Sequence, residues 1–215
     1  EQLTDSWRLL PMGGGDNDPT ATDLGDRLKQ GLIACRRMSR NPLASVCFIG
    51  SDCPDITPEH LKMLFRRVNR ARGNSASILP AADGGYVALA LSAGVPATVF
   101  DDVLWSDPMT FVSQLQALSR NEVSSIHVGD TLTDIDNIED IRDFHRRLSL
   151  LSTEERLSHG YQRTWAALMP FADTLTYRET SDDKVLEDGI ALVRGGHPDA
   201  KQVGQKMLNE AAAKS

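Results

Sequence analysis

The sequence predicts an α/β fold in which a layered sheet is flanked by helices. Three observations lead to this prediction. The apolar run Val46–Ile49 is typical of a strand that is buried on both faces. Apolar residues with helical spacing precede it, from Leu24 to Met38, and follow it, from Leu61 to Val68. Strands that alternate with helices in this way favour a layered sheet.

The elements after the first strand have recognisable boundaries. Thr57 can cap a helix whose first position suits Pro58, and Gly73 ends its apolar stripe. Residues 75–94, "SASILPAADGGYVALALSAG", read as two strands that flank a tight turn at Asp83-Gly84-Gly85. This part of the sequence therefore predicts a helix followed by a hairpin.

The rest of the α/β part continues the alternation. Residues 106–120 predict a helix that is capped by Ser106 or Asp107, and residues 123–129 predict a short strand. A further helix begins at Asn137, with Asp140 placed like the acid of a capping box.

Helical patterns dominate from Ser152 onward. We therefore expect an α/β domain over residues 1–150 and a helical extension over residues 151–215. These helices could also join copies of the chain in a homo-oligomer.

Composition narrows the classes of partner. The chain has 215 residues, of which 40% are hydrophobic, and a net charge of −7. It lacks the basic surplus that phosphate-backbone binding uses, so no nucleic-acid partner is expected. No apolar stretch approaches the ~18 to 20 residues of a membrane span. Cys35, Cys47 and Cys53 show no metal-finger spacing, and we expect a reducing, cytoplasmic setting.

Two acidic loops follow predicted strands. Asp52 comes directly after the first strand, and Asp134 and Asp136 come after the last. Their carboxylates are the ligands that Mg²⁺ or Mn²⁺ prefers, and the C-terminal ends of strands are where open α/β sheets bind ligands. The alternative is that acids in these loops only cap the helices that follow. If the loops bind one cation, they must meet in space.

Asp83, Gly84 and Gly85 could also line a pocket, because adjacent glycines let a ligand approach the backbone and Asp83 could accept from a sugar hydroxyl. The alternative is an ordinary hairpin turn. Trp105 could stack on a sugar ring or be partly buried core. No Ser-His-Asp or reactive-cysteine pattern is recognisable, so no catalytic residue is named.

Several segments together resemble a family of mostly uncharacterised proteins in the GT-A glycosyltransferase superfamily. In chain order, these segments are "TDLGDRL" (22–28), "FIGSDCPDITPEHL" (48–61), "LPAADGGYVALAL" (79–91), "VFDDVLWSD" (99–107) and "DIDNIEDI" (134–141). The resemblance covers about Trp7 to Leu148 and implies the Rossmann-like fold of nucleotide-diphospho-sugar transferases. In that fold a mixed, mostly parallel sheet has helices on both faces.

The resemblance also implies a function. It suggests a metal-dependent glycosyltransferase that uses a nucleotide-diphospho-sugar donor and an unknown acceptor. Asp52 and Asp134 or Asp136 would hold Mg²⁺ or Mn²⁺, and Asp83, Gly84 and Gly85 would line the sugar or acceptor pocket. A nucleotidyltransferase that acts on a sugar phosphate is the first alternative, because the same architecture and carboxylates serve that reaction.

The sequence departs from the family at its N-terminal end. Family members usually begin with a strand and a glycine loop that carries Lys and Arg, and nothing similar precedes Trp7. The expected domain is therefore N-terminally incomplete. An inactive relative that works as an interaction protein through its C-terminal helices is the second alternative.

Overall fold

The structure is a computed structural model that describes residues 23–39, 41, 43–71 and 73–175. The chain divides into two compact units, Glu1–Asp140 and Ile141–Ser215. The division comes before the predicted domain boundary at residue 150 and falls near the start of helix α4 (Ile138–Leu150). No helix among the described residues is long and apolar enough to cross a membrane.

The first unit contains a four-stranded sheet in the order β1-β3-β2-β4. The strands are β1 (Val46–Ile49), β2 (Ser75–Pro80), β3 (Tyr86–Leu91) and β4 (Ser125–Val128). β3 pairs antiparallel with both β1 and β2, and β2 pairs parallel with β4. The predicted α/β fold with a mixed sheet is confirmed. Three of the four strands, β1, β2 and β4, run in the same direction, as a mostly parallel sheet requires. The remaining strand, β3, runs in the opposite direction. Because β3 lies between β1 and β2, most strand pairings are antiparallel.

The burial predicted for β1 is wrong. In the sheet formed by the described residues β1 is an outer strand, where Ile49 is 48% exposed and the other strand residues are only half-buried. The strands that are buried along almost their whole length are β2 and β3, which occupy the middle of the sheet. The apolar run of β1 therefore does not reflect a central position.

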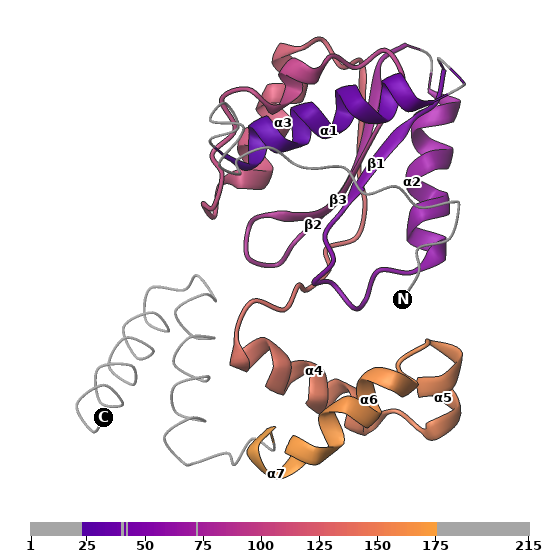
Figure 1. The fold of residues 1–215 in the computed structure, drawn as a ribbon, viewed down its shortest axis with the longest axis vertical. Helices are drawn as coiled ribbons and strands as arrows, with labels where there is room; N and C mark the ends of the chain where they lie inside the picture. Colours follow the sequence, from indigo (N-terminus) through magenta and orange to yellow (C-terminus); the bar gives the residue numbers. More distant parts are fainter. Residues whose placement is uncertain (1–22, 40, 42, 72, 176–215) are drawn as a thin grey trace, which may run out of the picture. The chain divides into compact units, whose positions relative to one another are not determined.

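Helices cover both faces of this sheet, as Figure 1 shows. α1 (Leu24–Met38) and α3 (Thr110–Arg120) pack on one face, where Leu32 and Leu118 join Leu89 of β3 in a hydrophobic core. α2 (Pro58–Arg70) packs on the other face, where Leu64 contributes to a second core. The alternating direction of strand side chains separates the two cores: Leu89 and Leu91 of β3 join the first, and Ala88 and Ala90 join the second.

The predicted helix starts agree with the structure at two helices and differ at a third. Thr57 caps α2 in a capping box with His60, and the Asn137 side chain accepts from the backbone N–H groups of Glu139 and Asp140 at the start of α4. The helix predicted after Asp107 begins later, at Thr110. Asp107 instead accepts from the Met109 N–H at 2.7 Å, which forms a turn ahead of the helix.

We expect replacement of Thr57 by alanine to lower the free energy of unfolding by about 1 kcal/mol. The Thr57 Oγ1 accepts from the His60 N–H at 3.3 Å, and the variant would leave this N–H without its capping partner. Urea unfolding followed by circular dichroism measures the loss. Thr57→Ser keeps the hydroxyl and should retain most of the stability; an equal loss in both variants would contradict the capping role.

The second unit is helical as far as it is described, with α5 (Thr153–Ser158), α6 (Gln162–Leu168), α7 (Ala172–Leu175) and a 3₁₀ turn, η2 (Met169–Phe171). The Trp165 ring stacks on the His145 ring, and the guanidinium carbon of Arg156 lies 4.5 Å from the centroid of the Trp165 ring. This agrees with the helical character expected there. The predicted helical stripes after residue 175 lie outside the described residues.

Candidate functional site

The acidic loops meet at one edge of the sheet because their strands run in the same direction. Asp52 follows β1, Asp83 follows β2, and Asp134 and Asp136 follow β4. Same-direction strands place their C-terminal ends at a common edge, which is where ligands bind open α/β sheets. The reversed strand β3 leaves from this edge, so the β2–β3 loop that carries Asp83 also lies there.

Backbone hydrogen bonds carry the chain after β4 across this edge. The Leu132 N–H donates to the Pro80 carbonyl at 3.0 Å, and the Leu132 carbonyl accepts from the Ala82 N–H at 2.9 Å, so the chain continues alongside the end of β2. The Ile135 N–H then donates to the Asp52 carbonyl at 3.0 Å. One short segment thus connects the loops that follow β1, β2 and β4.

The loop that carries Asp83 is held firmly. The Asp83 carboxylate accepts from the Gly85 N–H at 2.8 Å, and the Gly84 carbonyl accepts from the Phe111 N–H of α3 at 2.8 Å. Gly84 has φ +99°, a left-handed conformation that favours glycine. One hydrogen bond within the loop and another to α3 therefore fix its position.

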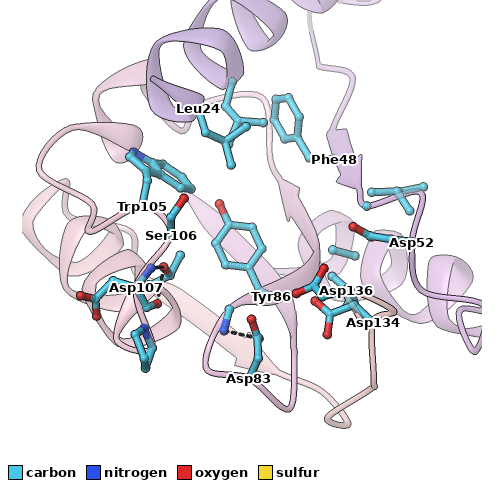
Figure 2. A pocket seen from close by; sticks show the side chains of 18 of the residues that line it. Leu24, Phe48, Asp52, Asp83, Tyr86, Trp105, Ser106, Asp107, Asp134 and Asp136 are labelled. Atoms are coloured by element: carbon cyan, nitrogen blue, oxygen red, sulfur yellow. Dashed lines mark hydrogen bonds between the residues drawn. The ribbon is translucent and has the colours of Figure 1, made fainter. Parts of the chain in front are cut away.

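A cavity of about 870 Å³ opens above these loops, within the first unit (Figure 2). Its volume lies toward the upper end of the range of roughly 300–1,000 Å³ that is usual for small-molecule sites. All of the predicted site residues except Gly84 line it: Asp52, Asp83, Gly85, Trp105, Asp134 and Asp136. A Cβ on Gly84 would instead approach the Pro108 backbone, which places Gly84 behind the wall of the cavity.

Three carboxylates form a compact group within this cavity. Oxygen atoms of Asp83, Asp134 and Asp136 all lie within 4.8 Å of one another. Asp52 lines the same cavity but does not belong to this group. The sequence predicts that Asp83 contacts the substrate and that Asp52 binds the metal. In the structure Asp83, rather than Asp52, forms a compact group with Asp134 and Asp136. In the sequence, Asp83 follows a strand just as Asp52 and Asp134 do; its place beside Asp134 depends on the parallel pairing of β2 with β4.

The electrostatics of the group favour a bound cation. Burial raises the pKa of the Asp134 carboxyl, and the charges of Asp83, Asp136 and Asp52 raise it further, while a backbone hydrogen bond acts in the opposite direction. A divalent cation would remove this mutual repulsion, and carboxylate oxygens are the ligands that Mg²⁺ or Mn²⁺ prefers. The chemistry and spacing of Asp83, Asp134 and Asp136 therefore fit such an ion.

This repulsion leads to a prediction about metal-free protein. Because the folded pKa of Asp134 lies above its usual 3.8, ionised Asp134 destabilises the folded state at neutral pH. Asp134→Asn should therefore raise the thermal midpoint in chelator-treated protein at pH 7. The gain should shrink as the pH falls through the raised pKa toward 3.8, because the wild-type carboxyl then becomes neutral.

Thermal unfolding at several pH values, with chelator present, measures this effect. Asp130→Asn is a control, since Asp130 is exposed on the same segment and does not line the cavity. A midpoint that falls at pH 7 in Asp134→Asn would show that the carboxylates do not repel one another as described.

The opposite part of the cavity wall is apolar and was not predicted as part of a site. It includes Leu24, Phe48, Tyr86 and Trp105, of which only Trp105 was expected. The rings of Tyr86 and Trp105 meet edge to face with centroids 6.4 Å apart. Burial raises the pKa of Tyr86, whose hydroxyl donates to Gln114 Oε1 at 3.1 Å. In the sequence, Leu24 fits the apolar stripe of a helix and Phe48 fits the apolar run of a strand. Neither pattern indicates that the residue lines a cavity.

Part of the chain matches a known protein family. The family described as "uncharacterized protein conserved in bacteria" (DUF2064) matches residues 17–107, a stretch that contains Asp52, Asp83 and Trp105 but ends before Asp134. None of the curated proteins matches the chain.

A solved structure is also similar, that of a "putative nucleotide-diphospho-sugar transferase" from Desulfovibrio desulfuricans G20. The TM-score is 0.58 at 23% identity, over 71% of this chain. The matched part spans 61% of the length of that protein. The fold of this chain is therefore similar to that of the Desulfovibrio protein.

Proposed function

We propose that this protein is a metal-dependent glycosyltransferase that uses a nucleotide-diphospho-sugar as its donor. The observation that carries the proposal is the group formed by Asp83, Asp134 and Asp136 in a cavity at the C-terminal edge of β2 and β4. The similarity of the fold to the Desulfovibrio protein supports the choice of donor. The family match to residues 17–107 is consistent with it.

In this proposal Asp83, Asp134 and Asp136 hold Mg²⁺ or Mn²⁺, and Asp52 adds negative charge nearby. When bound, the cation would neutralise the charge that develops on the departing diphosphate. Gly85 has no side chain, which lets the donor come close to the backbone of the β2–β3 loop. Trp105 offers a ring face on which a sugar can lie.

The transfer exchanges one carbon–oxygen bond for another. The acceptor hydroxyl oxygen bonds to the anomeric carbon of the sugar, while the bond from that carbon to the diphosphate oxygen breaks. The diphosphate keeps the electron pair of the broken bond, and the proton of the acceptor hydroxyl passes to water. The carboxylates position the charged half of the donor and leave the rest of the cavity for the sugar and the acceptor.

Calorimetric titration of the full chain with UDP, GDP and CDP, with and without Mn²⁺, tests the proposal. We expect one of these nucleotides to bind only when Mn²⁺ is present, because carboxylates and diphosphate repel each other without a cation between them. Absence of binding under both conditions would refute the proposal and favour an inactive relative. Release of pyrophosphate from a nucleoside triphosphate and a sugar phosphate would show a nucleotidyltransferase instead.

A further inference from the structure

The cavity has two chemically different ends, as Figure 2 shows. The carboxylates of Asp83, Asp134 and Asp136 gather at one end, while Leu24 and Phe48 lie at the other and Tyr86 stands between the two groups. A single site that combines a charged end with an apolar end suits two ligands, or one ligand with two dissimilar halves. The metal and diphosphate account only for the acidic end.

The apolar end offers carbon surface that a ligand could bury. Leu24 is 49% exposed although it lines the cavity, and Phe48 is held by an edge-to-face contact with Phe100 at 5.5 Å. The Leu24 position is fixed because Asp23 caps α1 and accepts from the Asp26 N–H at 2.9 Å. Covering such apolar surface stabilises a complex by roughly 25 cal/mol per Å².

The hydroxyl of Tyr86, which lies between the two ends, is already engaged. The Tyr86 hydroxyl donates its hydrogen to Gln114 Oε1, and Gln114 Nε2 donates to the Val99 carbonyl at 2.8 Å. Recognition of a nucleobase needs donors and acceptors that face its edge, whereas Leu24 and Phe48 present only carbon. This end therefore fits an aliphatic or aromatic group better than the polar edge of a base.

We propose that the acceptor is an uncharged, hydroxyl-bearing molecule whose apolar ring or chain lies against Leu24 and Phe48. Its hydroxyl then points toward the carboxylate end. There the hydroxyl oxygen bonds to the anomeric carbon, the bond from that carbon to the diphosphate breaks with its electron pair on the diphosphate, and the hydroxyl proton passes to water. The acidic end disfavours anionic acceptors. This inference rests on the proposed function, since it names the second substrate of the same cavity.

A pair of glucosides that differ only in the alkyl group tests the inference. Octyl β-D-glucopyranoside, kept below its micelle concentration, and methyl β-D-glucopyranoside are titrated into the full chain in the presence of Mn²⁺ and the nucleotide that binds. We expect the octyl compound to bind at least about tenfold more tightly, as burial of about two methylene groups would produce. Equal affinities would overturn the inference.

Leu24→Gln and Ile33→Gln form a matched pair of variants. Both positions lie on α1 and are partly exposed, at 49% and 41%, but only Leu24 lines the cavity. Leu24→Gln should reduce the preference for the octyl compound about fivefold or more, and Ile33→Gln should leave it unchanged. An equal reduction in both would show that the alkyl chain binds elsewhere and would overturn the inference.

The nucleotide titration separates this inference from the proposed function. If Mn²⁺-dependent nucleotide binding is absent, the proposed function fails whatever the glucosides do. If the nucleotide binds and octyl glucoside displaces it, the apolar end belongs to the donor and the acceptor inference is overturned. If nucleotide and octyl glucoside bind at the same time, and Leu24→Gln reduces the preference for octyl glucoside, the result would support both the proposed function and the acceptor inference.

Discussion

Replacement of Asp134 by asparagine is expected to weaken Mn²⁺-dependent nucleotide binding on the order of 100-fold. Even partners in the outer shell of a metal site typically cost 10- to 100-fold when they are removed, and Asp134 belongs to the carboxylate group that would contact the ion. The amide keeps the size of the side chain but removes the charge that holds a hard cation. Calorimetric titration with Mn²⁺ and the nucleotide measures the loss.

Two further variants make this test specific. Asp130→Asn removes one negative charge from the same segment, outside the cavity, and should leave the affinity within about twofold, since screening reduces the effect of distant exposed charges. Asp52→Asn should have an intermediate effect, because Asp52 lines the cavity but lies outside the compact group. If the Asp130 and Asp134 variants lose affinity equally, the carboxylate group does not hold the ion.

Replacement of Gly84 by alanine is expected to lower the free energy of unfolding by about 3 kcal/mol or more. The added Cβ would lie 2.0 Å from the Pro108 carbonyl oxygen, and φ is +99° at this position. A left-handed backbone costs a residue with a side chain roughly 1–2 kcal/mol, and overpacking typically adds 1–3 kcal/mol. Urea unfolding followed by circular dichroism measures the change.

Gly73→Ala is the matched control for this substitution. Gly73 has a similar φ of +85°, but its added Cβ would meet only the Ser124 Oγ, at 3.1 Å. We expect a loss of about 1–2 kcal/mol, mainly from the backbone. If both variants lose the same amount, the contact between the β2–β3 loop and Pro108 is not what fixes this loop. Displacement of the loop in Gly84→Ala should also weaken nucleotide binding, because Asp83 moves with it.

Local chemistry allowed much of the fold to be predicted. The apolar stripe from Leu24, the cap at Thr57 and the turn at Asp83-Gly84-Gly85 each depend on residues close together in the sequence, and the structure contains all three. The burial of β1 could not be predicted in the same way. An apolar run is compatible with a middle or an outer strand, and only the order of pairing decides between them.

The sequence by itself determined the kinds of element and the presence of acids after three of the strands. The tertiary structure decided which acids became neighbours. Asp83 joins Asp134 and Asp136 because β2 pairs in parallel with β4, and Leu132 then continues that pairing beside Pro80 and Ala82. Such contacts join residues about fifty positions apart, where neither helical nor strand periodicity carries information. Physically, the site depends on strand direction and order, which are properties of the whole packed sheet.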